Sequence, residues 1–482
     1  MQKSLVKNSI YNIVYTTINI LFPLITSIYS ARILLPAGIG TVAYSQNIAS
    51  YFVTFAALGL PSYGVREFAK IRENTAARNR LFTELILLNF ISTTIAVISY
   101  AWLLLHNADH LDTRLYIASG AVIFFNYLNI DWLYRGIEEY GYITGRSFAV
   151  KILSFVCLVL FVKDQKDYVV YAWINSLATA SNYLFNVFHA RKFVAFDFSG
   201  LNLSKHIQPL LSIALIIFLG SVYSKVDVTM LGMLSTSESV GYYGHSQKIV
   251  TMVVAFSNAI TGALLPRLSY CYLNDRTAFY SLLKKGFDIL CLTTLPLAVG
   301  LFLVAEQAVI ILYGSSFTPA ILTIRLLCPV IIIKCFGDLF CYQLAYSTKN
   351  EKIIIPASGC AAVLNILANA ALIPVLHQNG AVIASLISEF ITNAIQFVYM
   401  KRKVKFNLNW RSLLISVAAT SLMAAVVLSV LCLNLPIILS IVSAILCGVV
   451  AYVMANIMLK NPLAMDVVGW AKKKLLHRIK SV

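Results

Sequence analysis

Long apolar segments, each about the length of a membrane-spanning helix, recur along the whole chain. A helix needs about 20 mostly apolar residues to cross a bilayer, and the pattern predicts about fourteen such spans. They cover roughly residues 9–31, 40–61, 82–105, 115–134, 147–162, 168–189, 206–231, 241–265, 284–304, 321–346, 353–373, 381–400, 412–432 and 437–459. The connections are short and leave no room for an extramembrane domain. We therefore expect an all-α polytopic membrane protein.

Composition agrees with this expectation, and the charge distribution orients the spans. The 482 residues are 59% hydrophobic, with a mean hydropathy of +0.79. The net charge is +18, and most of the 38 lysines and arginines fall in alternate loops. Basic residues collect in cytoplasmic loops, so this alternation predicts that both termini lie in the cytoplasm. The basic residues then serve as topological signals and lipid-headgroup contacts, and we expect no nucleic acid as a partner.

A short stretch near the start of the chain recurs about 200 residues later. Residues 34–48 (LLPAGIGTVAYSQNI) and 235–249 (STSESVGYYGHSQKI) share Gly40 with Gly241, Ser45 with Ser246, Gln46 with Gln247 and Ile48 with Ile249. Both stretches enter the second span of a half, which predicts a parallel repeat of six helices. The expected organisation is a six-helix bundle at 1–190, a cytoplasmic linker at 191–205 and a second six-helix bundle at 206–400. Two further helices and a basic tail follow at 401–482.

Ionisable residues gather between Gly220 and Lys248. Lys225 and Asp227 fall in the seventh span, and His245 and Lys248 in the eighth. Such groups cost several kcal/mol within a membrane unless they face a polar cavity or a partner. We therefore expect a water-filled cavity that handles something charged. Its candidate substrate-binding residues are Asn12, Asn19, Arg32, Tyr44, Asn47, Lys225, Asp227, His245, Lys248, Lys334 and Asp338.

Structural alternatives exist for several of these residues. The polar stripe of the first span, with Asn12 and Asn19, could bind a neighbouring helix instead of lining a cavity. Lys334 and Asp338 are one helical turn apart and could neutralise each other. Asp227 could pair with Lys248 on the next span. Lys248 could also extend its amine toward the outer headgroups.

Catalytic and metal-binding motifs are missing from the sequence. No phosphate-binding loop, zinc-protease motif or nucleophile elbow occurs, and the nine cysteines lie in or beside apolar segments without ligand spacing. We expect no enzyme, no catalytic residues, no cofactor and no metal.

Three motifs resemble the bacterial polysaccharide repeat-unit flippases. They are YGVREFAK after the second span, WLYRGIEEYGYITGRS between the fourth and fifth, and LYGSSFTPA before the tenth. This group belongs to the multidrug/oligosaccharidyl-lipid/polysaccharide exporter superfamily, which includes the lipid II flippases and the multidrug and toxin extrusion transporters. The resemblance runs from residue 1 to about 460. It implies two six-helix bundles that form a V, open to one side of the membrane at a time.

The resemblance also implies a substrate, a place and partners. A polyprenyl-diphosphate-linked oligosaccharide would move from the cytoplasmic to the outer leaflet of a bacterial inner membrane, for O-antigen, capsule or exopolysaccharide synthesis. Membrane lipids would be partners, together with polymerase and chain-length machinery. Lipid II flippases hold cations on helices 1, 2 and 8. Here Arg32 and Lys248 fall on comparable helices, whereas the second span has no cation.

Two other functions are compatible with parts of the pattern. An ion-coupled multidrug exporter shares the architecture, but its cavity should favour acids that bind cations, whereas this one carries bases as well. A membrane polysaccharide polymerase or ligase has a similar size. Such an enzyme is expected to carry a long outer loop for its chemistry, whereas no outer loop expected here exceeds a short turn.

The charge pattern makes a topological prediction. Cytoplasmic reporters should label residues 66–80, 191–205 and 401–411, and external reporters should label 106–114 and 376–380, because basic loops stay inside. Cysteine accessibility in intact cells measures this. External labelling of 191–205 would contradict both the fourteen-span topology and the two-halves organisation.

Overall fold

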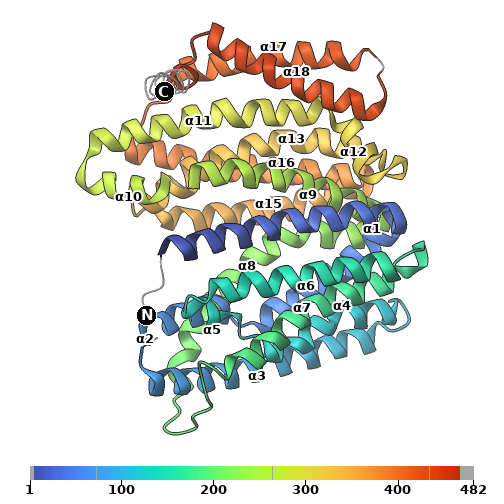
Figure 1. Cartoon of the computed structure of the whole chain (residues 1–482), viewed down its shortest axis with the longest axis vertical. Coiled ribbons are helices and arrows are strands. Elements are labelled where there is room, and N and C mark those ends of the chain that lie inside the picture. Colours follow the sequence, from blue (N-terminus) through green and yellow to red (C-terminus); the bar gives the residue numbers. More distant parts are fainter. Residues whose placement is uncertain (1–4, 72, 263, 434, 467–482) are drawn as a thin grey trace, which may run out of the picture. The chain divides into compact units, whose positions relative to one another are not determined.

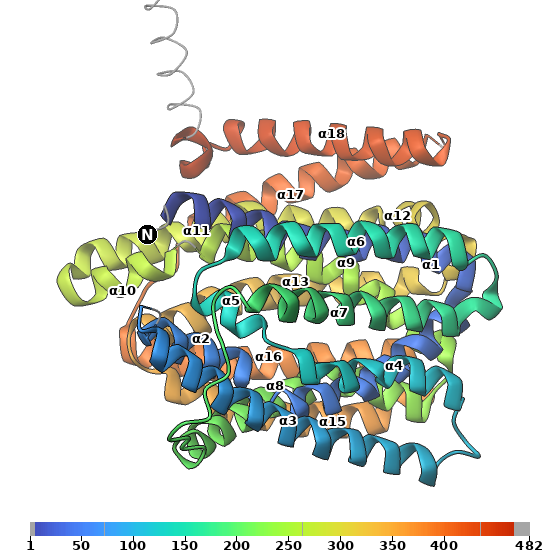
Figure 2. The same cartoon turned by 60° about the horizontal axis from the view of Figure 1, so that its bottom comes forward.

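Helices make up the two compact units into which the chain divides, Met1–Gly241 and Tyr242–Val482. The computed structural model describes residues 5–71, 73–262, 264–433 and 435–466 (Figures 1 and 2). The first unit holds α1 (Leu5–Ala56), α2 (Leu60–Ile71), α3 (Thr75–His106), α4 (Thr113–Phe125), η1 (Asn126–Leu128), α5 (Asp131–Gly136), α6 (Tyr140–Phe161), η2 (Gln165–Asp167), α7 (Tyr168–Ala190) and α8 (Ser204–Leu234). Helix α9 (Ser237–Gly262) begins in the first unit and continues in the second.

The second unit is also built from helices. It holds α10 (Leu264–Asn274), α11 (Arg276–Leu303), α12 (Ala305–Tyr313), η3 (Ser315–Phe317), α13 (Ala320–Gly337), the π-helix η4 (Asp338–Gln343), α14 (Leu344–Ser347), η5 (Glu351–Ile353), α15 (Ile354–Leu376), α16 (Gln378–Val404), α17 (Trp410–Leu431) and α18 (Ile437–Met458). Helices α17 and α18 pack side by side (Figure 2). The hydroxyl of Tyr452 on α18 donates to the backbone oxygen of Leu292 on α11 at 2.8 Å.

The described helices include ten that are long and apolar enough to cross a membrane, or eleven if the bent pair α9 and α10 counts as one span. Among the other expected spans, 168–189 coincides with α7, whereas 115–134 is divided among α4, which ends at Phe125, η1 and α5. The first two expected spans fall within α1 and the start of α2. No strand occurs in the ranges that the structure describes. The expected all-α polytopic membrane fold is confirmed. The division into two six-helix bundles joined at 191–205 stays a prediction.

Helix α1 contains both of the first two expected spans, joined at a single residue. Leu35 has φ 56° and ψ 174°, which interrupts the helix, and Pro36 follows it. A positive φ is strained for leucine, whereas proline is well suited to the first position of a helix. The sequence predicted a short connection between residues 31 and 40, but helical structure reaches Leu35 and resumes immediately after it.

The two glycines matched by the repeat lie against each other within the first unit. A Cβ atom on Gly40 would lie 1.6 Å from the backbone oxygen of Ser237, and one on Gly241 would lie 2.3 Å from that of Pro36. Neither site can therefore accept a side chain. Small residues allow two helix backbones to approach this closely. The contact gives a packing reason for glycine at both positions of the repeat.

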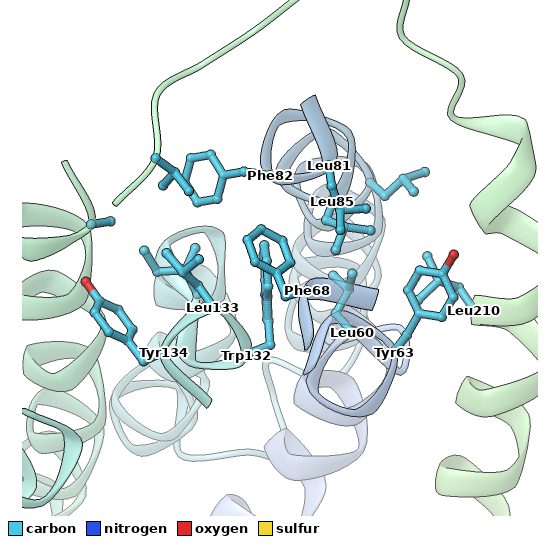
Figure 3. Close-up of a cluster of buried hydrophobic side chains, with 14 of the residues drawn as sticks. Leu60, Tyr63, Phe68, Leu81, Phe82, Leu85, Trp132, Leu133, Tyr134 and Leu210 are labelled. Carbon is cyan, nitrogen blue, oxygen red and sulfur yellow. The ribbon is translucent and has the colours of Figure 1, made fainter. Parts of the chain in front are cut away.

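An aromatic cluster centred on Trp132 joins three helices of the first unit (Figure 3). The Trp132 ring lies 5.2 Å from Phe68 and 6.1 Å from Phe82, centroid to centroid. A Cβ atom on Gly64 of α2 would lie 2.9 Å from the indole, so α2 packs directly on the ring. Trp132 and its neighbours belong to the WLYRGIEEYGYITGRS motif. This part of the motif therefore packs the ends of α2, α3 and α5 together.

Replacing Trp132 tests this cluster. Trp132→Ala should destabilise the protein by about 3–5 kcal/mol, because the indole is only 1% exposed and leaves a cavity. Trp102→Ala is the matched control, since Trp102 is 66% exposed, and should cost about 0.5 kcal/mol or less. Thermal unfolding of the purified proteins in one detergent measures both. Equal losses in the two variants would contradict the packing role.

Candidate functional site

A polar seam runs between α1 and α8 in the first unit, formed by Asn47, Tyr51, Lys225 and Thr229. The Asn47 amide donates to the Thr229 hydroxyl at 2.7 Å, and the Tyr51 hydroxyl lies 2.8 Å from the same oxygen. The Lys225 ammonium lies 5.8 Å from the centre of the Tyr51 ring. Each helix contributes two residues four apart, which places them on one face. The seam thus joins two candidates from the sequence, Asn47 and Lys225.

The chemistry of the α1–α8 seam is cationic and rich in hydroxyl groups. Lys225 is half-buried, and its ammonium group lies near the Tyr51 ring. Its backbone oxygen accepts a hydrogen bond from the Asn47 amide at 3.3 Å. An aromatic face attracts a cation without neutralising it. A lysine held in this way can still attract an anion, while the neighbouring hydroxyl and amide groups suit sugar hydroxyls.

Tyr44 lies on α1, one turn before Asn47, and packs against α8. A Cβ atom on Gly232 of α8 would lie 2.0 Å from the Tyr44 ring, so this glycine leaves room for the tyrosine. A second close contact therefore holds α1 against α8 beside the seam. Of the other candidates on α1, Arg32 is exposed, and the side chain of Asn12 lies outside the described residues.

A second cation contacts α1 from α6. The Lys151 ammonium donates to the Asn19 side-chain oxygen at 2.7 Å and to the backbone oxygen of Ile18 at 3.2 Å. It also lies 5.5 Å from the centre of the Phe22 ring. Asn19, a candidate from the sequence, is thus a ligand for a lysine. Lys151 is not among the candidates from the sequence, although its place a full turn inside the fifth expected span, 147–162, is a signal that could have found it.

The candidates around residue 240 have different environments. Asp227 is buried at 8% exposure in the first unit. His245 is buried at 1% exposure in the second unit, where its ring lies 4.7 Å from Tyr313 and 5.2 Å from Phe317. Lys248 is exposed. The expected pairing of Asp227 with Lys248 joins residues of different units and stays a prediction.

The expected pairing of Lys334 with Asp338 is wrong. The Lys334 ammonium instead binds Glu389 of α16 at 3.0 Å, and Asp338 accepts a 2.7 Å hydrogen bond from Gln343. The helix changes to π geometry at Asp338, and that geometry brings residues five apart together. The carboxylate therefore meets Gln343 within the π-helix, and the lysine takes a partner from another helix.

Sequence analysis missed an ion pair between the buried Arg146 and the half-buried Asp131, which joins α5, α6 and α7. The Arg146 guanidinium donates to the Asp131 carboxylate at 3.1 Å and to the backbone oxygen of Asn182 at 3.1 Å. It also bonds the side chain of Asn186, which in turn donates to Asp131. Asp131 and Arg146 lie in the motif region of the sequence, but their 15-residue separation gives no sign of a pair. The network neutralises both charges within the first unit.

A second network fixes the start of α8. The buried Glu84 carboxylate of α3 accepts from Lys205 at 2.9 Å, from His206 at 2.8 Å and from the Asn202 backbone N–H at 2.8 Å. The other ring nitrogen of His206 lies 2.6 Å from the Tyr63 hydroxyl. One carboxylate thus ties α3 to the end of the linker and the start of α8.

The linker itself is held along α3. Backbone groups of the linker bond the side chains of Asn79 at 3.0 Å and Thr83 at 2.8 Å. Hydrogen bonds from the Ser199 hydroxyl and backbone lower the pKa of the Asp197 carboxyl below its usual value. A cavity of about 430 Å³ beside this region is lined by Glu84, His206 and further polar and apolar residues of α2, α3 and α8. In the described residues, no group of three or more His, Cys, Asp or Glu side chains could hold a metal ion.

Comparison with known proteins identifies the family. Residues 5–271 match the polysaccharide biosynthesis protein family, which is more than half of the chain. This chain belongs to that family. Residues 155–449 also match the lipid II flippase MurJ family. The expected relationship to the exporter superfamily is thereby confirmed.

Two curated relatives of this chain are informative. One is an Escherichia coli (strain K12) protein whose name proposes it as an O-antigen transporter, 24% identical over 405 residues that cover 83% of this chain and 97% of the relative. The other is a Haloferax volcanii protein named as a probable low-salt glycan biosynthesis flippase. It is 22% identical over 208 residues, 43% of this chain and 44% of the relative.

Solved structures related to this family member show the same fold. An inward closed form of the lipid II flippase MurJ has a TM-score of 0.76 at 15% identity, covering 94% of this chain and 99% of that one. An inward-facing multidrug resistance transporter of the MATE family has a TM-score of 0.62 at 13% identity, covering 80% and 94%.

Breaking the Arg146 pair tests whether it stabilises the first unit. Arg146→Met should cost about 3 kcal/mol, because it leaves the Asp131 charge without its cation, whereas Arg146→Met with Asp131→Asn should recover most of the loss. Arg135→Met is the control, since Arg135 is exposed on the same motif. Thermal unfolding in detergent measures all three. Wild-type stability of the single Arg146 variant would contradict the role.

Proposed function

We propose that this chain is a flippase for a polyprenyl-diphosphate-linked oligosaccharide repeat unit. It moves the head group from the cytoplasmic to the outer leaflet by alternating access and supplies surface polysaccharide synthesis, such as that of an O-antigen. Family membership and the names of the two relatives support the reaction class. The proposed cellular location is the bacterial inner membrane, with both termini in the cytoplasm. The proposed partners include polymerase and chain-length machinery.

The α1–α8 seam is the observation that carries this proposal. A diphosphate needs a cation, and the sugars need hydrogen-bonding groups in place of water. Lys225 provides the cation, and Asn47, Tyr51 and Thr229 provide the groups for the sugars. The prenyl tail prefers hydrocarbon and can remain in the bilayer. The remaining candidates, Asn12, Asn19, Arg32, Tyr44, Asp227, His245, Lys248, Lys334 and Asp338, are proposed as supporting groups of the same pathway.

An ion-coupled multidrug exporter is the second candidate, because a MATE transporter has the same fold. The charge of the seam argues against a cationic drug, since Lys225 would repel it. Expression in a strain that lacks its drug exporters separates the two functions. Protection against cationic dyes, without any effect on surface polysaccharide, would favour the exporter over the flippase.

Substitution of Lys225 tests the proposal. In a flippase-deficient strain, Lys225→Arg should keep most of the surface polysaccharide and Lys225→Met should reduce it at least tenfold, because the site needs a charge. Lys166→Met, at an exposed position of η2, is the control and should keep full activity. Surface polysaccharide and membrane abundance are measured together. Full complementation by Lys225→Met at normal abundance would remove the seam from the substrate site.

A further inference from the structure

An aromatic crevice of about 410 Å³ lies in the second unit between α11, α13, η4 and α16. We call it the phenylalanine crevice, because five phenylalanines line it. These are Phe287, Phe336, Phe340, Phe390 and Phe397. Its size falls within the range of about 300–1,000 Å³ that is usual for small-molecule sites. Side chains normally fill a volume of this size between packed helices. Because they do not fill the crevice, a ligand can occupy it.

The lining of the phenylalanine crevice selects hydrocarbon. Asn393 brings the only amide or charged side chain to the described lining, and its amide donates to the backbone oxygen of Glu389 at 2.8 Å. The oxygen of the same amide packs against Gly337, where a Cβ atom would lie 1.9 Å from it. A polar head would thus find no partner inside. Phe390 is 61% exposed at the edge, so an apolar chain can enter from the side.

The segment after α16 folds back along one end of the phenylalanine crevice. Lys405 ends the helix in the left-handed conformation, and the buried Phe406 ring stacks on Phe340 at 5.1 Å. Leu408 then lines the crevice. Two hydrogen bonds hold this segment to α11. Tyr280 donates to the backbone oxygen of Val404 at 2.8 Å, and the Asn409 amide donates to Asp288 at 2.9 Å.

A cluster of four exposed cations lies beside this end of the crevice. It comprises Lys401, Arg402, Lys403 and Lys405, and we call it the 401–405 cluster. Among the ion pairs of the described residues, none involves the cluster. The contact found for one member is with an aromatic ring, since the Lys403 ammonium lies 5.9 Å from the centre of the Tyr399 ring. Four positive charges therefore lie beside one end of an apolar crevice whose edge at Phe390 is exposed.

We propose that the phenylalanine crevice and the 401–405 cluster form a binding site for an anionic phospholipid of the cytoplasmic leaflet. One acyl chain fills the crevice, and the phosphate lies on the cluster. The charge pattern of the loops predicts that the cluster lies at the cytoplasmic surface, where anionic headgroups attract lysine and arginine. This site is separate from the seam that holds the proposed substrate, and it does not depend on the flippase function.

A phospholipid fits better than the prenyl tail of a transported substrate. The cluster is exposed at the end of a helix and anchored through Phe406, Asn409 and Val404, so its position is fixed. A transported lipid has to leave the cation that holds it as the head moves to the other leaflet. The cluster has no such requirement, and a resident lipid can stay there. Its stabilising effect would act on the second unit alone.

Blocking the crevice tests the proposal. The full chain is purified in detergent, and native mass spectrometry measures retention of phosphatidylglycerol and phosphatidylethanolamine of equal chain length. We expect at least fivefold higher retention of the anionic lipid. Ala394→Phe, inside the crevice, should reduce it to the phosphatidylethanolamine level, and Ala418→Phe, on the exposed surface of α17, should leave it unchanged. Because Ala394→Phe could disturb packing, Val398→Phe at the exposed edge serves as a second blocking variant.

The charged half of the site has its own matched pair of variants. Arg402→Gln with Lys405→Gln should remove the preference for the anionic lipid. Lys349→Gln with Lys352→Gln, on exposed residues of another loop at the same expected surface, should preserve it. Equal retention of the two lipids by the wild type, or unchanged retention in both crevice variants, would overturn the proposal. Displacement of phosphatidylglycerol by an equimolar polyprenyl phosphate would also overturn it, since the crevice would then hold a prenyl tail.

Discussion

Charges within membrane-spanning helices need partners inside the protein, and the packing of both units depends on this requirement. The structure meets it in two ways. Arg146 and Lys334 bind carboxylates from other helices, so their charges are neutralised and they join helices together. Lys151 and Lys225 are held by amide, backbone or aromatic groups, which position a cation without cancelling it. The second kind of contact costs more in a membrane and leaves a charge available to a ligand. Lys151 and Lys225 are therefore better placed than Arg146 and Lys334 to attract an anionic ligand.

The motif by which the family can be recognised has a packing role that is distinct from this chemistry. Trp132 fills the space between α2 and α3, and Arg146 neutralises Asp131. These contacts hold the ends of the helices in the first unit. The α1–α8 seam has no residue in that motif. A substitution in the seam therefore leaves the packing contacts of the motif in place.

The sequence predicts the elements of this fold better than their contacts. Spans follow from the length of apolar runs, because a bilayer requires a fixed length of helix. Gly40 and Gly241 were visible through the repeat, but their direct contact was not. The candidates Asn47 and Lys225 are 178 residues apart, and only the packing of α1 on α8 shows that they share one seam. For Lys334, the sequence offered Asp338 as the nearest acid, and the change to π geometry removed that partner.

The single-residue reversal at Leu35 has a mechanical consequence. Flexible loops let neighbouring helices slide or tilt separately, because a few residues absorb the change in backbone angles. Helix α1 has no flexible loop between its two parts, since the helix reaches Leu35 and resumes at Pro36. The angle between its two parts is therefore set by the backbone angles of Leu35 alone. Asn19 of the first part binds Lys151 of α6, and Asn47 of the second part binds Thr229 of α8. The relative position of these two contacts along α1 therefore depends on the backbone angles of a single residue.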